Sequence, residues 1–100
     1  MTAADHIQTF GRAHVTSERF LSALIGIAEF HFEQQDITRD ETEWGLRAFA
    51  AISLRRAGKH GRKLDVPNDV DAWMAEPDVK AILDPIVSEA MRRGGWDGTA

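Results

Sequence analysis

Apolar side chains recur at intervals of three and four residues through most of this sequence, and that spacing constrains the fold more than any other feature. The most regular stripe comprises Val79, Ile82, Leu83, Ile86, Val87, Ala90 and Met91. Residues three, four and seven apart share one face of an α-helix, whereas the residues of a strand alternate between two faces. The stripe therefore predicts an amphipathic helix that starts at Pro77 and ends at Gly94-Gly95. Pro85 should kink it, with Asp84 acting as a local cap.

A second helix is predicted to run from the N-cap candidates Thr16 and Ser17 to about Gln35. Its apolar positions are Phe20, Leu21, Leu24, Ile25, Ile27, Ala28, Phe30 and Phe32. These positions form a broad stripe, so the helix should lie at the centre of the core. Gly26 in its middle is unfavourable by about 1 kcal/mol relative to alanine, which predicts that another helix crosses close to it.

A third helix is expected to begin at a capping box. The Thr38 hydroxyl can accept a free backbone N–H of the first turn, while the Glu41 side chain reaches back to the cap. The apolar residues that follow are Trp44, Leu46, Ala48, Phe49, Ala51, Ile52 and Leu54. Gly58 should end this helix, with Arg55 and Arg56 at the negative end of its dipole.

Shorter helices are expected over residues 2–13, where Gly11 interrupts the pattern, and from Pro67 through Met74. Trp73 and Met74 would face the core. No stretch shows the alternation of a strand, and no internal repeat is present.

The sequence thus predicts a single all-α domain over residues 1–100, a compact bundle of four to five helices. A basic loop is expected over 58–66 and a loose C-terminal tail over 95–100. A monomer of this size buries only about 60 to 65% of the surface that its unfolded chain exposes. Assembly into a homo-oligomer would add to that burial.

Composition and the distribution of apolar residues indicate where in the cell the protein is expected. The chain has no cysteine, which excludes disulfides, thiol chemistry and Cys-based zinc sites. It shows neither the basic and apolar segments of a secretory signal nor an apolar run of the roughly 18 residues that a membrane span needs. A cytoplasmic protein that does not enter the membrane is expected.

The sequence shows no convincing catalytic set. Its serines are not in a Gly-x-Ser-x-Gly turn, and no strand precedes a glycine-rich phosphate loop, so neither an enzyme nor a cofactor is predicted. Glu29 and Glu33 share a helix face, but His31 points elsewhere, so no metal is assigned to them. A carboxylate metal or ligand site on this second helix is retained as an alternative function.

Positive charge is concentrated in one segment of a chain whose net charge is −4. The segment holds five cations in nine residues: Arg55, Arg56, Lys59, Arg62 and Lys63. These side chains could contact an anion or a phosphate backbone, which makes a small nucleic-acid-associated regulator a second alternative. Cations are also favoured at a helix C-terminus, and the loop has no aromatic residue that could stack on bases.

Apolar residues of the C-terminal half favour a protein partner. Tryptophan and methionine are typical of interface centres, and the candidate contacts are Trp73, Met74, Ile86, Met91 and Trp96. The main prediction is a non-catalytic protein-interaction or assembly factor.

One segment also resembles a known family. Residues 42–58 read Thr-Glu-Trp-Gly-Leu-Arg-Ala-Phe-Ala-Ala-Ile-Ser-Leu-Arg-Arg-Ala-Gly, and Val-Asp-Ala-Trp follows at 70–73. This alanine-rich helix before a short acidic segment resembles small helical phage tail assembly chaperones over roughly a third of the chain. The helical N-terminal region departs from the family, whose members often begin with a β-rich or irregular stretch. The resemblance implies a non-enzymatic protein that binds a long tape-measure polypeptide transiently during tail assembly.

Overall fold

The computed structural model describes residues 11–58 and 69–96, and the regular elements in these two ranges are all helical. The elements are α2 (Arg12–Val15), α3 (Glu18–Glu33), α4 (Arg39–Gly58), α5 (Val70–Ala75), α6 (Pro77–Met91) and the π-helical turn η2 (Arg92–Trp96). The predicted all-α bundle is thus confirmed for this part of the chain. Outside the described residues lie most of the predicted first helix, Pro67, the loop cations Lys59, Arg62 and Lys63, and residues 97–100.

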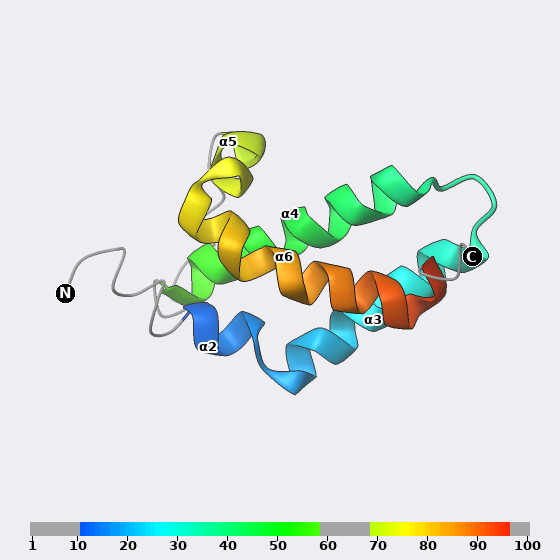
Figure 1. Ribbon diagram of the computed structural model, residues 1–100, viewed down its shortest axis with the longest axis horizontal. Coiled ribbons are helices and arrows are strands. Elements are labelled where there is room, and N and C mark those ends of the chain that lie inside the picture. The colour runs from blue at the N-terminus through cyan, green and yellow to red at the C-terminus, as the bar shows by residue number, and fades with distance from the viewer. Residues whose placement is uncertain (1–10, 59–68, 97–100) are drawn as a thin grey trace.

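Helix α6 packs against both α3 and α4, and Figure 1 shows α5 and η2 at its opposite ends. The core consists of Val15, Phe20, Leu24, Ala28, Leu46, Ala50, Ala51, Leu54, Val79, Ile82, Leu83, Val87, Ala90 and Met91. The predicted stripe of α6 is confirmed, because every member except the half-buried Ile86 is buried. None of the described helices is long and apolar enough to span a bilayer.

The caps predicted for the two long helices are formed. The Ser17 hydroxyl accepts the Phe20 N–H at 3.2 Å at the start of α3. At the start of α4, the Glu41 N–H donates to the Thr38 hydroxyl at 3.1 Å, and the Thr38 N–H donates to the Glu41 carboxylate at 2.9 Å. Short-range sequence signals therefore fix where α3 and α4 begin.

The capping box makes stability depend on pH. The backbone N–H of Thr38, and secondarily its hydroxyl, hold the pKa of Glu41 below its ordinary value of 4.5. A lowered folded-state pKa contributes stability above the unfolded pKa, and this contribution is lost as the pH falls through the folded-state value. Glu41→Ala should therefore lower the free energy of unfolding more at neutral pH than at about pH 3. Urea unfolding at both pH values measures the difference, and an equal loss at both would contradict the capping role of the charge.

The close helix crossing predicted at Gly26 lies elsewhere. Gly26 is exposed, and a Cβ atom built on it would meet no atom within 4 Å. The close approach instead involves Gly94 of η2, whose Cβ would lie 2.5 Å from the Ala28 Cβ. Gly11 has a similar role beside α4, since its Cβ would lie 2.5 Å from the Leu54 carbonyl oxygen.

Two details of the predicted helices also need correction, namely the start of the short helix and the role of Asp84. The short helix α5 begins at Val70, where the Asp69 carboxylate accepts the Ala72 N–H at 3.0 Å as the N-cap. Asp84 does not cap a break in α6, which continues through Pro85. Its carboxylate instead accepts a hydrogen bond from the Arg47 guanidinium at 2.5 Å, because the two side chains face each other between α6 and α4.

The prediction of a loose tail over 95–100 is wrong for its first two residues. Helix α6 ends at Met91, and the chain continues as η2 through Trp96, with Gly95 at a φ of 104°. The Phe32 ring lies against Gly95, where a Cβ would be 3.3 Å from a ring carbon. The Trp96 carbonyl accepts a hydrogen bond from Arg39 at 2.5 Å. The turn is therefore held by both α3 and α4.

Candidate protein-binding surface

Trp73 and Trp96 anchor short elements to the bundle. The Trp73 indole N–H donates to the Ala51 carbonyl of α4, and the Trp96 indole N–H donates to the Ala28 carbonyl of α3, each at 2.8 Å. Both rings are half-buried against the core. The prediction that Trp73 faces the core is confirmed. Trp96, which the sequence predicts to lie in the tail, also packs against the core.

The five predicted partner contacts lie on separate parts of the molecule. Trp73 and Met74 belong to α5, whereas Trp96 belongs to η2 at the far end of α6 (Figure 1). Met91 is only 3% exposed and is part of the core, and Ile86 is half-buried. Of this set, Met74 and Met91 each line a surface hollow, and both hollows are described below.

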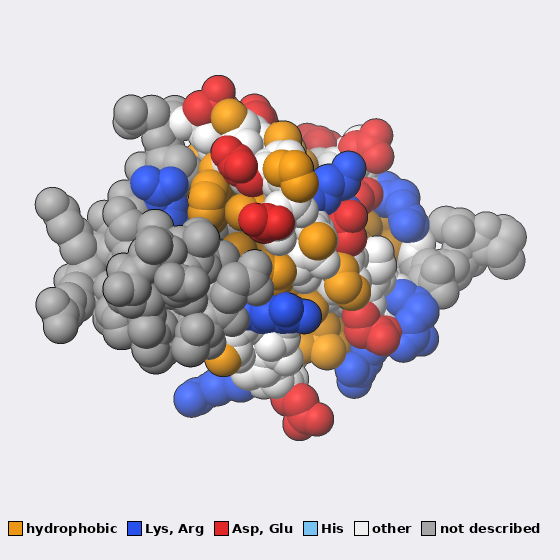
Figure 2. All heavy atoms as spheres, turned by 60° about the vertical axis from the view of Figure 1, so that its left-hand side comes forward, with side chains coloured by type: hydrophobic (Ala, Val, Ile, Leu, Met, Phe, Trp, Pro, Cys, Tyr) orange, Lys and Arg blue, Asp and Glu red, His pale blue; other side chains and the backbone are white. Residues whose placement is uncertain are grey.

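The basic segment is represented in the structure by its first two residues. The Arg55 guanidinium lies over the Trp73 ring, 5.2 Å from its centre, while Arg56 is exposed. Arg55 thus supports the anchoring of α5. On the face shown in Figure 2, the described lysine and arginine side chains are interspersed with acidic and apolar ones.

Four large aromatic side chains that the sequence assigned to helix stripes are substantially exposed. Phe30 is 60% exposed, Phe32 53%, Trp44 52% and Phe49 45%. Two of the four rest on aromatic rings of other elements: Phe49 stacks on Phe20 at 5.6 Å between ring centres, and Phe32 meets Trp96 edge-on at 5.3 Å. Exposed aromatic rings of this size are common at protein-binding surfaces.

Trp44 is held in place by a distant part of the chain. Its indole N–H donates to the Asp71 carboxylate of α5 at 2.9 Å, so the ring is fixed while half of its surface stays open to solvent. Asp71 also lines a hollow of about 370 Å³, with Glu43, Arg47, Met74, Ala75 and Lys80. We refer to it as the α5 hollow. A fixed aromatic ring therefore lies beside a concave surface that contains a methionine.

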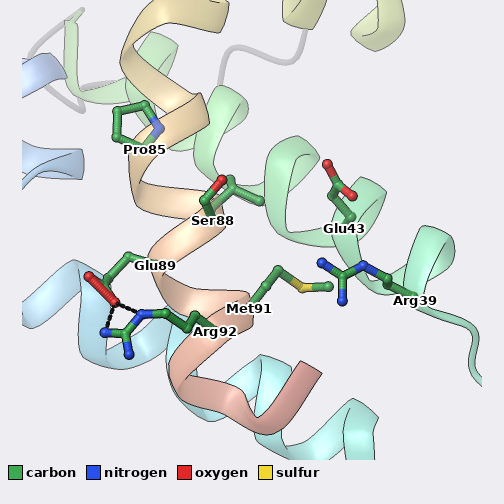
Figure 3. A pocket seen from close by; sticks show the side chains of 8 residues that line it. Arg39, Glu43, Pro85, Ser88, Glu89, Met91 and Arg92 are labelled. Carbon is green, nitrogen blue, oxygen red and sulfur yellow. Dashed lines mark hydrogen bonds and ion pairs between the residues drawn. The ribbon is translucent and has the colours of Figure 1, made fainter. Parts of the chain in front are cut away.

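A second hollow, the η2 hollow, lies between the start of α4 and the end of α6. It has a volume of about 410 Å³ and is lined by Arg39, Glu43, Pro85, Val87, Ser88, Glu89, Met91 and Arg92. Figure 3 shows the Met91 side chain extending from α6 toward Arg39, while the ion pair of Glu89 with Arg92 lies on the other side of α6. Glu43 lines both hollows, so they adjoin along α4.

Arg47 connects the helices beside the α5 hollow. Its guanidinium contacts Glu43 at 3.2 Å and Asp84 at 2.5 Å, and 23% of its side chain is exposed. One cation paired with two carboxylates fixes α4 against α6. One wall of the hollow is therefore formed by Glu43 and Arg47, which are hydrogen-bonded to each other.

The residues of the alternative metal site do not converge. Glu29 and Glu33 are exposed, whereas the His31 imidazole Nδ1 is 3.2 Å from the hydroxyl of the buried Thr42. Among residues 11–58 and 69–96, no three His, Asp or Glu side chains are grouped as metal ligands would be. In this structure, His31 connects α3 to α4.

Sequence reasoning did not single out Trp44 or the α5 hollow. The Trp44–Asp71 hydrogen bond joins residues 27 positions apart, so no local pattern indicates it. No family model, curated protein or solved structure was found to match this chain.

Proposed function

We propose that this domain is a non-catalytic protein-interaction or assembly factor that binds a polypeptide segment at Trp44 and the α5 hollow. The observation that supports this proposal best is the fixed, half-exposed Trp44 ring beside a concave surface. An aromatic side chain that is already ordered loses little conformational freedom on binding, which is the property of an interface hot spot.

The hollow suits a segment with an apolar anchor and polar flanks. Met74 offers a polarisable and adaptable contact for an apolar side chain, and Trp44 offers a flat ring. Lys80 and Asp71 place charges of both signs around them, so polar groups of the bound segment could be hydrogen-bonded at the rim. The resemblance to tail assembly chaperones suggests, as part of this proposal, a segment of a long tape-measure polypeptide.

Selection from a random peptide library on the immobilised domain tests the proposal and does not require the partner to be identified. We expect an enriched peptide family whose affinity falls about 30-fold on Trp44→Ala, since hot-spot residues contribute about 2 kcal/mol. Fluorescence anisotropy with labelled peptides measures the change. Phe49→Ala is the matched control, because Phe49 is similarly exposed on α4 but stacks on Phe20 of α3.

Two outcomes would count against the proposal. One is a library that yields no enriched family, and the other is peptides that bind Trp44→Ala as tightly as the unmodified protein. The salt dependence of binding separates the nucleic-acid alternative. Affinity for a phosphate backbone falls steeply with added salt, whereas binding through Trp44 and Met74 should change little.

A further inference from the structure

The outward face of α3 contains an exposed residue pattern that the rest of the described chain does not cover. Gly26 lies in the middle of the helix, exposed and with room for a Cβ atom. Ser22 and Ala23, one turn earlier, are exposed as well, and Phe30, one turn later, is at 60% the most exposed large apolar side chain of residues 11–58 and 69–96. Figure 1 shows α3 along one edge of the bundle.

Phe30 differs from the other exposed aromatic residues. Phe32, Trp44 and Phe49 each contact a side chain of another element through a ring contact or a hydrogen bond. Within the described residues, the only ring close to Phe30 is that of its neighbour His31, at 6.2 Å between centres. No aromatic ring of another described helix therefore packs against it.

Charges flank this face symmetrically. Arg19 lies seven residues before Gly26 and Glu33 lies seven residues after it, so both occur two turns away on the same side of α3. Each is about 10 Å from Gly26 along the axis. Both are exposed, and within the described part of the chain neither forms an ion pair or a side-chain hydrogen bond.

We infer that a second copy of this chain docks on this face, with the two α3 helices antiparallel and crossing at Gly26. A two-fold axis through the crossing brings together residues at equal distances before and after Gly26. Arg19 of each copy then meets Glu33 of the other. Phe30 of each copy lies over Ser22 of the other, where a small side chain leaves room for the ring.

This charge complementarity indicates that the partner on this face is a second copy of the chain. The same face provides both the cation and the carboxylate, and both the large ring and the small residue. It is therefore complementary to the same face of an antiparallel copy. Glycine at the centre lets two helix backbones approach closely, which explains a residue that disfavours the helix and that no other described segment packs against within 4 Å of a Cβ. The dimer face shares no residue with Trp44 or the α5 hollow, so it does not depend on the proposed peptide binding.

Sedimentation equilibrium with charge-reversal variants tests this arrangement. A contact between single helices is small, so we expect a dissociation constant on the order of 10–100 µM. Arg19→Glu and Glu33→Arg should each weaken the dimer by about tenfold, because each replaces two attractive pairs with two repulsive ones. The double variant should recover the affinity of the unmodified protein, since it restores both pairs with the charges exchanged.

Three results would overturn the inference. The unmodified protein could remain monomeric up to millimolar concentration, the single reversals could leave a dimer unaffected, or the double variant could be as weak as the single ones. Arg19 and Glu33, like Phe30, are exposed, and circular dichroism at low concentration verifies that each variant is folded. Phe30→Ser gives a second, uncharged measure, and we expect it to abolish detectable dimer at the concentrations that saturate the unmodified protein.

Discussion

Gly94→Ala is expected to lower the free energy of unfolding by about 3 kcal/mol, at the upper end of the cost of overpacking a close contact. The new Cβ would lie 2.5 Å from the Cβ of Ala28 and 3.2 Å from backbone atoms of Ala28 and Glu29. These atoms belong to the middle of α3, so they cannot move aside without displacing the helix. Urea unfolding followed by circular dichroism measures the loss.

Gly26→Ala is the matched control for this substitution. It adds the same methyl group to an exposed helical position with no neighbour within 4 Å. The expected result at low protein concentration is a gain of about 0.5–1 kcal/mol, because alanine restricts the unfolded chain and favours the helix. If Gly94→Ala were no less stable than the unmodified protein, the close contact between η2 and α3 would not be formed.

Trp96→Ala is expected to destabilise the fold by about 2–3 kcal/mol, although Trp96 lies in what the sequence indicates as a loose tail. The substitution removes the hydrogen bond to the Ala28 carbonyl and the edge contact with Phe32. Trp96→Phe keeps an aromatic ring and should lose only about 1 kcal/mol, the typical net contribution of one hydrogen bond. Denaturant unfolding compares the two variants with the unmodified protein.

Trp44→Ala provides the contrast for Trp96→Ala. Trp44 also donates its indole N–H to one acceptor, but half of its surface is exposed in the folded state. We therefore expect a smaller loss of stability than for Trp96→Ala. If Trp96→Ala and the unmodified protein unfolded at the same denaturant concentration, the anchoring of η2 would be wrong.

The predictable part of this fold is the part encoded by neighbouring residues. The Ser17 cap and the Thr38–Glu41 box involve residues three positions apart, so their spacing in the sequence is sufficient to identify them. The stripe of α6 is similarly local, because a single repeating interval defines its buried face. Fold class and the starts of the long helices follow from such signals.

Contacts between distant residues could not be predicted in this way. Gly26 and Gly94 are both glycines in or beside a helix, and only the packing of η2 on α3 makes Gly94 the close contact. The broad stripe of α3 likewise gave no indication that Phe20 would be buried and Phe30 exposed, because that choice depends on where α4 and α6 lie. The candidate site was missed for the same reason, since Asp71 reaches Trp44 only through the tertiary fold.

The contacts of η2 also affect how the molecule can open. Trp96 receives a hydrogen bond from Arg39 at the start of α4 and gives one to Ala28 in the middle of α3. At Gly94, η2 lies so close to α3 that no side chain would fit between them. Release of this single turn would therefore break contacts with α3 and α4 at the same time, so η2 opens as part of the cooperative unit that these packed helices form and not as an independently fraying end.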